Sequence, residues 1–370
     1  MRSSFVRTAS AISLSLATLS AQDPALTWRG EPLDVAALAS AVPGAEASVR
    51  AWLPFAAEHG YRLVLADDAR TVLVLSPTCA RKNPKKEHRE VDVMLGLLRD
   101  SAAVADRFLA PWADGAAPAV IVCVRTEHYR PLLAHVASLD PRLKEWSESA
   151  GRAVAGFILS EPFVGAWIED PTGVEEWYPY NELVHRATQL QLRGRAGELP
   201  AWLLLGLAWH VEDTVCKSVY CFPYRNGFVS VGAHTDWGLW LANEFKKGRR
   251  EKGGKPALLS IDEFATWRPG AVASEFEESK AYLSFGMACF LADEHAEKLR
   301  GILAAFDAAI EKGRVTWISA NEWTTNPDFQ LTSDEQLATL QGLGDDILDR
   351  ATEFFRGKKA NERRVAKAGR

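Results

Sequence analysis

Apolar runs in the first half of the chain predict a set of β-strands. Residues 61–77 hold two β-prone apolar runs around an Asp-Asp-Ala-Arg turn, which predicts a hairpin. Residues 118–133 begin with a continuous apolar run, which predicts a buried strand that passes into a helix. Residues 151–170 predict two further strands joined around a Ser-Glu-Pro sequence. We expect these strands to share one sheet.

Apolar positions three and four residues apart predict helices in much of the remaining chain. We expect one helix in residues 91–112 and another that begins near Pro179. A third helix is expected to begin at Pro200, because proline is favoured at the first helical position. From Ser260 onward the pattern is mainly helical.

Two segments lack periodic apolar positions and are expected to be loops: the charged residues 80–90, and residues 220–256, which are rich in glycine and aromatic residues and then strongly basic. The combined pattern predicts an α+β fold with a mixed sheet and a mainly helical C-terminal lobe. We divide the chain into an N-terminal α/β region at 25–115 and a larger domain at 116–355.

The first 21 residues resemble a secretory signal peptide. Arg2 and Arg7 precede a short apolar core, and Ala21 is a suitable small residue for cleavage. We therefore expect an exported protein, periplasmic or extracellular, and exclude residues 1–21 from the fold. A buried N-terminal helix is the alternative. No later apolar run reaches the length of a membrane-spanning helix, so no membrane span is expected.

Charge gives little indication of a partner. The formal net charge is −5, which gives no reason to expect nucleic acid as a partner. The basic residues 356–370 lack apolar periodicity and are expected to form a disordered, solvated end, with contact to an anionic surface as the alternative.

The chain has five cysteines, an odd number that cannot pair completely. Cys123 and Cys289 lie in apolar runs, where a cysteine acts as a small buried hydrophobic residue. Cys216 and Cys221 are close enough in sequence for a local disulfide. The absence of a C-x-x-C pair argues against a zinc ribbon or a redox motif.

Residues 178–190, YPYNELVHRATQL, contain the second half of the zinc-peptidase motif H-E-x-x-H. Glu182 and His185 have the spacing of the general base and the second metal ligand, but Asn181 occupies the position of the first histidine. On its own an E-x-x-H match is weak, and a hydrogen-bonded, partly buried His185 is the structural alternative.

Residues 199–213, LPAWLLLGLAWHVED, extend the match. They are similar to the second helix of gluzincin zinc peptidases, in particular the secreted bacterial peptidase-MA-like family, in which this helix supplies a glutamate as the third zinc ligand. The matching residues are Pro200, Trp202, Leu203, Gly206, Leu207 and Ala208. Leu205 stands where the glutamate belongs. The resemblance covers roughly residues 60–350 and implies a zincin-like fold with the site in a cleft.

Two of the three implied zinc ligands are therefore lost, at Asn181 and Leu205. Amide oxygen is a poor zinc ligand and leucine offers none, so His185 alone would not hold zinc tightly. Without zinc, Glu182 would lack a metal-bound water to deprotonate. We expect no cofactor, with zinc implied only if other residues replace the lost ligands.

The possible substitutes are His210, Glu212 and His234. Helix geometry places His210 on a different face from Leu205, and places Glu212 about 10 Å farther along the axis. His234 lies in an expected loop. Tyr282 is a candidate to stabilise an oxyanion, a role that tyrosine has in gluzincins, although a tyrosine on a packed helix is more often structural.

The sequence leads to the hypothesis of an exported zinc-metallopeptidase homologue with a degenerate metal site. Such a protein would bind a peptide or protein segment without cleaving it, by β-augmentation along the strand in residues 163–170. One alternative is an active zinc peptidase with unconventional ligands, in which Glu182 is the base and His185 is a ligand. A second alternative is a structural or glycan-binding envelope protein.

Overall fold

A computed structural model describes thirteen segments of the chain: residues 27–28, 31–32, 44–66, 70–77, 84–150, 156–169, 178–221, 237–248, 258–267, 278–316, 318–319, 322–323 and 329–357. The expected signal peptide, His234 and the basic residues 358–370 lie outside the described residues.

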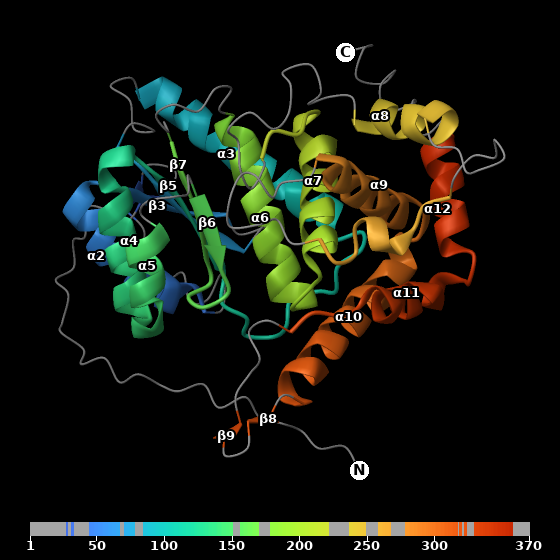
Figure 1. Cartoon of the computed structure of the whole chain (residues 1–370). Coiled ribbons are helices and arrows are strands. Elements are labelled where there is room, and N and C mark those ends of the chain that lie inside the picture. The colour runs from blue at the N-terminus through green and yellow to red at the C-terminus, as the bar shows by residue number, and fades with distance from the viewer. Residues whose placement is uncertain are drawn as a thin grey trace.

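One mixed sheet of five strands organises the first half of the molecule (Figure 1). Its strands, in chain order, are β3 (Arg62–Ala66), β4 (Thr71–Leu75), β5 (Ala119–Val124), β6 (Gly156–Leu159) and β7 (Val164–Ile168). The spatial order is β3-β4-β5-β7-β6. The β4-β5 and β5-β7 pairs are parallel, and the β3-β4 and β6-β7 pairs are antiparallel.

The predicted strands are confirmed. Every residue of β5 is buried, because both faces of this central strand are covered, and this explains its uninterrupted apolar run. One expectation about the sheet is wrong, however. The segment 163–170 forms β7, which pairs with β5 on one side and β6 on the other, so it offers no edge to a peptide. The outer strand at this end of the sheet is β6.

Helices cover both faces of the sheet (Figure 1). The core of one face joins the strands to α2 (Ala45–His59), α4 (Tyr129–Leu139) and α5 (Lys144–Ala150). The core of the other face joins them to α3 (Pro84–Ala105) and α6 (Pro179–Ala196). The start of α3 corrects the part of the expected loop at 84–90, whereas residues 80–83 lie outside the described residues. Lysine, glutamate and arginine have high helix propensity, so this charged stretch continues the helix toward its N-terminus.

A third core belongs to the mainly helical C-terminal lobe. It packs α7 (Ala201–Cys216) against α9 (Glu278–Glu294), and these two helices approach closely at Gly206. A Cβ atom there would collide with the carbonyl oxygen of Ser284, so glycine is required at this crossing.

The other helices of the lobe are α8 (Trp237–Asn243), α10 (Ala296–Thr316), α11 (Ser333–Leu340) and α12 (Ile347–Arg356). The shorter elements are β1 (Thr27–Trp28), β2 (Glu31–Pro32), η1 (Thr126–His128), η2 (Pro141–Leu143), η3 (Glu244–Gly248), η4 (Ile261–Glu263), β8 (Ile318–Ser319), β9 (Glu322–Trp323) and η6 (Gln341–Leu343). The presence of α8 and η3 corrects part of the loop expected at 220–256.

The described residues form a mixed α+β structure, as predicted. The boundary drawn between residues 115 and 116 falls between β4 and β5, which are neighbours in the same sheet. None of the described helices has the length and apolar character needed to cross a membrane.

Candidate functional site

The candidate site lies where α6 and α7 pack side by side between the sheet and the helical lobe (Figure 1). Proline at position 179 begins α6, and Gly197, with a φ of 77°, follows its last residue. The short connection turns the chain back, so the first turns of α6 lie beside the last turns of α7. This hairpin brings Asn181, Glu182 and His185 next to Glu212, and all four side chains are buried.

The carboxyl group of Glu212 is the centre of a hydrogen-bonded cluster. Asn181 Nδ2 donates to Glu212 Oε1 at 2.7 Å, and the backbone N–H groups of Tyr220 and Cys221 donate to the same oxygen at 2.6 and 3.1 Å. His185 Nδ1 lies 3.0 Å from the other oxygen, Oε2. One carboxyl group thus joins both helices to the segment that follows α7.

This placement corrects the expectation that Glu212 would lie about 10 Å beyond the position of the missing ligand. Leu205 does not lie at the level of α7 that meets Asn181 and His185. In the antiparallel hairpin it is instead the end of α7 that meets the start of α6. Leu205 lies nearer the middle of α7 and belongs to the apolar core of the helical lobe.

Burial raises the pKa of Glu212 to about 8, against the hydrogen bonds from Tyr220, Asn181 and Cys221 that lower it. The negative charge of Glu182 raises this pKa further. All three N–H donors point to Oε1. The proton of the neutral acid therefore belongs on Oε2, from which it is donated to Nδ1 of His185.

Glu182 is held in a separate contact. Arg186 Nη2 donates to Glu182 Oε2 at 2.8 Å, and the thiol of Cys221 donates to the same oxygen at 3.1 Å. Burial lowers the pKa of Arg186, but the negative charge of Glu182 and its hydrogen bond outweigh this effect, and the net pKa is raised. The carboxylate proposed as a general base is therefore ion-paired with Arg186, one helical turn away.

The pairing of Glu182 with Arg186 was missed in the sequence. The i,i+4 spacing of the two residues on a predicted helix was the signal that could have revealed it. The role of Cys221 had no such signal, because its position depends on how the chain leaves α7.

The structure does not contain the disulfide expected between Cys216 and Cys221, and both residues are thiols. Cys221 is buried and directs its sulfur toward Glu182. The sulfur of Cys216 lies 3.9 Å from the carbonyl oxygen of Tyr180. The two thiols thus have different partners on α6.

Two other candidates lie in different surroundings. His210 is buried near the ring of Phe108, with its Nε2 4.0 Å from Asp293 Oδ1. Tyr282 packs between Trp237 and Trp240 and donates its hydroxyl to Glu278 at 2.7 Å. Both residues therefore contact groups outside the Glu212 cluster.

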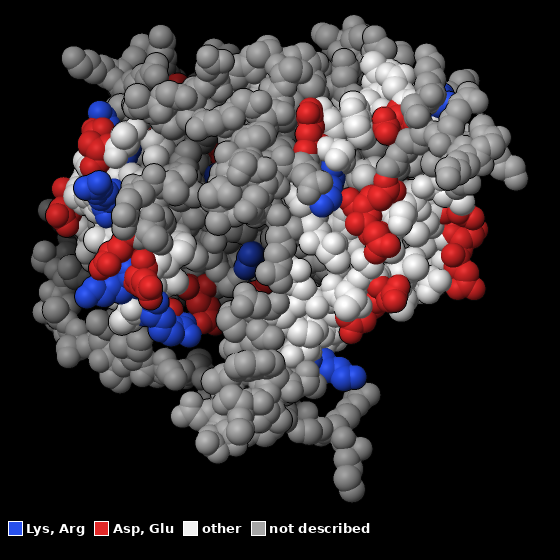
Figure 2. Space-filling view, in the orientation of Figure 1, with Lys and Arg blue, Asp and Glu red and all other residues white. Residues whose placement is uncertain are grey.

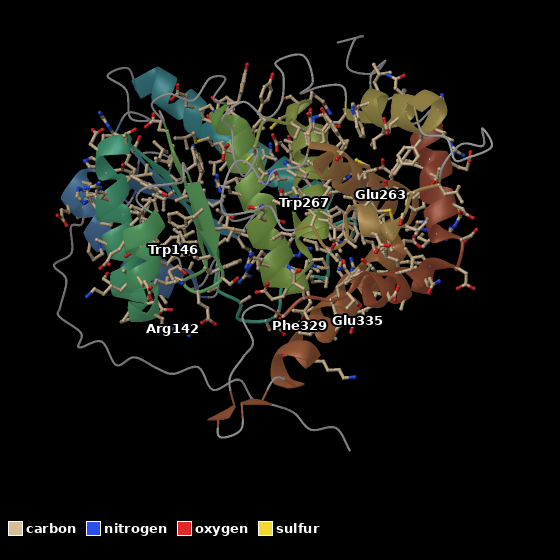
Figure 3. All side chains as sticks on the ribbon, in the orientation of Figure 1. Arg142, Trp146, Glu263, Trp267, Phe329 and Glu335 are labelled. Carbon is tan, nitrogen blue, oxygen red and sulfur yellow. The ribbon has the colours of Figure 1, made fainter. Side chains whose placement is uncertain are left out.

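Aromatic side chains pack beside the Glu212 cluster. The indole of Trp209 lies 6.1 Å from the ring of His185 and donates its N–H to the carbonyl oxygen of Cys221 at 2.7 Å. Trp209 also stacks with Trp267, which Figure 3 shows close to α7. Tyr178 and Tyr220 stack at 3.8 Å beside the first turn of α6, and Tyr178 is partly exposed.

The donor set does not fit a catalytic zinc ion. Such an ion takes three protein ligands and leaves one position open. His185 and Glu212 are the two side chains here that could act as zinc ligands. Asn181 already directs its amide nitrogen to Glu212. Within the part of the chain that the structure describes, no group of three His, Cys, Asp or Glu side chains has metal-binding geometry.

In comparisons with known proteins, no family model, no curated protein and no solved structure matches this chain.

Proposed function

We propose that this protein is an exported homologue of gluzincin zinc peptidases, of the peptidase-MA-like kind, in which a hydrogen-bonded cluster has replaced the metal. In this proposal it binds a peptide segment without cleaving it. The observation that carries the proposal is the convergence of Asn181, His185 and Glu212 on one helical hairpin under a mixed sheet.

The chemistry of the three groups supports loss of the metal. A zinc peptidase needs its ligands as electron-pair donors around a cation. Here the amide of Asn181 and the imidazole of His185 bond directly to Glu212, so these groups satisfy one another. Buried polar groups with complete hydrogen bonding stabilise a fold without a metal.

The state of Glu182 supports loss of hydrolysis. A general base must be able to accept a proton from the attacking water. Oε2 of Glu182 already accepts hydrogen bonds from Arg186 and from the thiol of Cys221, so this oxygen is engaged with protein groups rather than directed at a water.

A peptide would bind along β6, the outer strand of the sheet. Among the described strands β6 pairs only with β7, so its other edge is the one that β-augmentation would use. At Gly156 a Cβ atom would collide with Arg186, so the glycine allows β6 to lie directly against α6. A strand added to β6 would consequently pass beside the helix that carries the Glu212 cluster.

Zinc content and peptide hydrolysis together test the loss of catalysis. We expect far less than one equivalent of zinc after zinc is added back and the excess removed. We also expect no cleavage of a peptide library above the level of Glu182→Gln. One equivalent of zinc that is lost in His185→Ala would contradict the proposal.

Hydrogen exchange tests the binding mode. A bound extended peptide is expected to slow exchange of backbone amides in residues 156–159, with the α5 amides as an internal reference. Peptide binding with unchanged exchange in β6 would rule out β-augmentation at this edge.

The second candidate is an active metallopeptidase with unconventional ligands. The contact between His185 and Glu212 favours it, because these are two ligand types that zinc accepts. Hydrolysis that disappears both with a chelator and in Glu182→Gln would establish this alternative.

A further inference from the structure

A groove on the helical lobe, separate from the Glu212 cluster, has the properties of a binding site. It is open to solvent, measures about 660 Å³ and lies between the end of α9, the segment at Leu258 and α12. Phe290 and Phe354 form part of its wall, with ring centroids 5.5 Å apart. Leu258 adds an exposed apolar side chain.

The rim of the groove is acidic. Glu294, Asp349 and Glu353 line it, and all three are exposed. Figure 2 shows acidic side chains gathered on the part of the helical lobe that carries α11 and α12. An apolar wall beneath carboxylates suits the side chain of lysine or arginine, which has an apolar stem and a cationic head. The aromatic rings add a cation–π attraction.

The positive groups of the groove do not cancel this charge. Arg350 is bonded to Asp346 and to the carbonyl oxygen of Leu343. Burial lowers the pKa of His295, and the nearby charge of Arg350 lowers it further, so this imidazole is neutral near pH 7. Glu353 forms an ion pair with Arg356, but its own side chain remains 70% exposed.

We propose that the groove binds the basic C-terminal segment of this same chain, residues 358–370. Gly357 lines the groove, and the segment begins at the next residue. The segment contains six basic residues and one acidic residue. Thirteen residues extend to about 40 Å, so lysine and arginine side chains can reach the rim without rearrangement of the lobe.

Trypsin cleavage of the full-length protein tests this inference, with intact mass as the measurement. Docked lysines and arginines are protected, so the segment is removed slowly from the native protein. Glu294→Gln combined with Glu353→Gln is expected to accelerate its removal about tenfold, since two exposed ion pairs are lost. Raised salt is expected to accelerate it as well.

A matched control separates the groove from net charge. Glu145 and Glu148 are exposed on α5, on the far side of the sheet, and Glu145→Gln with Glu148→Gln changes the net charge equally. This double variant is expected to keep the original cleavage rate. Lys358→Gln with Lys359→Gln is expected to accelerate cleavage at Arg363 and Arg364, as the groove variant does.

Equal cleavage rates in the native protein, the groove variant and the control would overturn the proposal. Protection that disappears on dilution would also overturn it, because the occupant would then be the segment of a second copy.

Discussion

At the residue scale, Asn181 decides the character of the cluster. Its amide nitrogen donates to Glu212 and cannot bind a metal, whereas a neutral histidine at the same position would have a ring-nitrogen lone pair available for a cation. Together with His185 and Glu212, that histidine would complete the three ligands that zinc requires.

We therefore predict that Asn181→His creates a zinc site. The variant is expected to retain close to one equivalent of zinc after equilibrium dialysis, as measured by elemental mass spectrometry, while the native protein retains far less. Adding His185→Ala or Glu212→Gln should abolish the gain. A variant that folds but gains no zinc would show that these positions do not surround a metal-sized space.

The Glu182–Arg186 pair gives a second prediction at this scale. Glu182 is buried and the Arg186 side chain is only 13% exposed, so removal of one partner leaves an uncompensated charge. Arg186→Met and Glu182→Gln are each expected to lower the free energy of unfolding by about 3–5 kcal/mol. The double variant should lose clearly less than the sum. Urea denaturation measures all three, and strict additivity would mean that the pair does not act as a unit.

At the scale of elements, the close approach of α7 to α9 depends on the absence of a side chain at Gly206. A Cβ atom at this position would overlap the backbone of α9 and push the two helices apart. Since α7 carries Glu212, this contact also positions the cluster against α6.

We predict that Gly206→Ala lowers the free energy of unfolding by about 1–3 kcal/mol, the usual cost of overpacking. Gly301→Ala is the control, because Gly301 lies within α10 with open space around the added Cβ. That control is expected to stabilise the protein by about 0.5–1 kcal/mol through higher helix propensity. The same sign in both variants, measured by urea denaturation, would contradict the packing argument.

At the scale of the whole molecule, Glu212 links stability to pH. Its pKa is about 8 in the folded protein, well above that of an exposed glutamate. Between these two values the folded state keeps a proton that the unfolded state has released. The contribution of this group is therefore present at low pH and is lost as pH rises toward 8.

We predict that Glu212→Gln reduces this pH dependence. Glutamine resembles the protonated acid, because it accepts hydrogen bonds through one atom and donates to His185 through the other. Unfolding curves at several pH values between about 5 and 8 should show a free energy that falls less steeply with pH in the variant. Parallel curves for both proteins would mean that Glu212 is ionised throughout this range.

The sequence by itself determined most of the secondary structure. The continuous apolar run of β5 and the hairpin of β3 and β4 could be predicted because burial leaves a direct record in residue pattern. The start of α6 and of α7 could be predicted from Pro179 and Pro200 because proline acts locally on the backbone. Glu182 and His185 could be placed in the first two turns of α6 because its start at Pro179 was predictable.

Only the tertiary structure decided which residues meet. Glu212 reaches Asn181 and His185 because the register of the α6–α7 hairpin aligns the end of one helix with the start of the other. Cys221 reaches Glu182, rather than Cys216, through the path of the chain after α7. The interior position of β7 follows from pairing with β5, which is distant in sequence. Spacing along one element specifies its own faces, whereas contacts between elements depend on packing that no local pattern records.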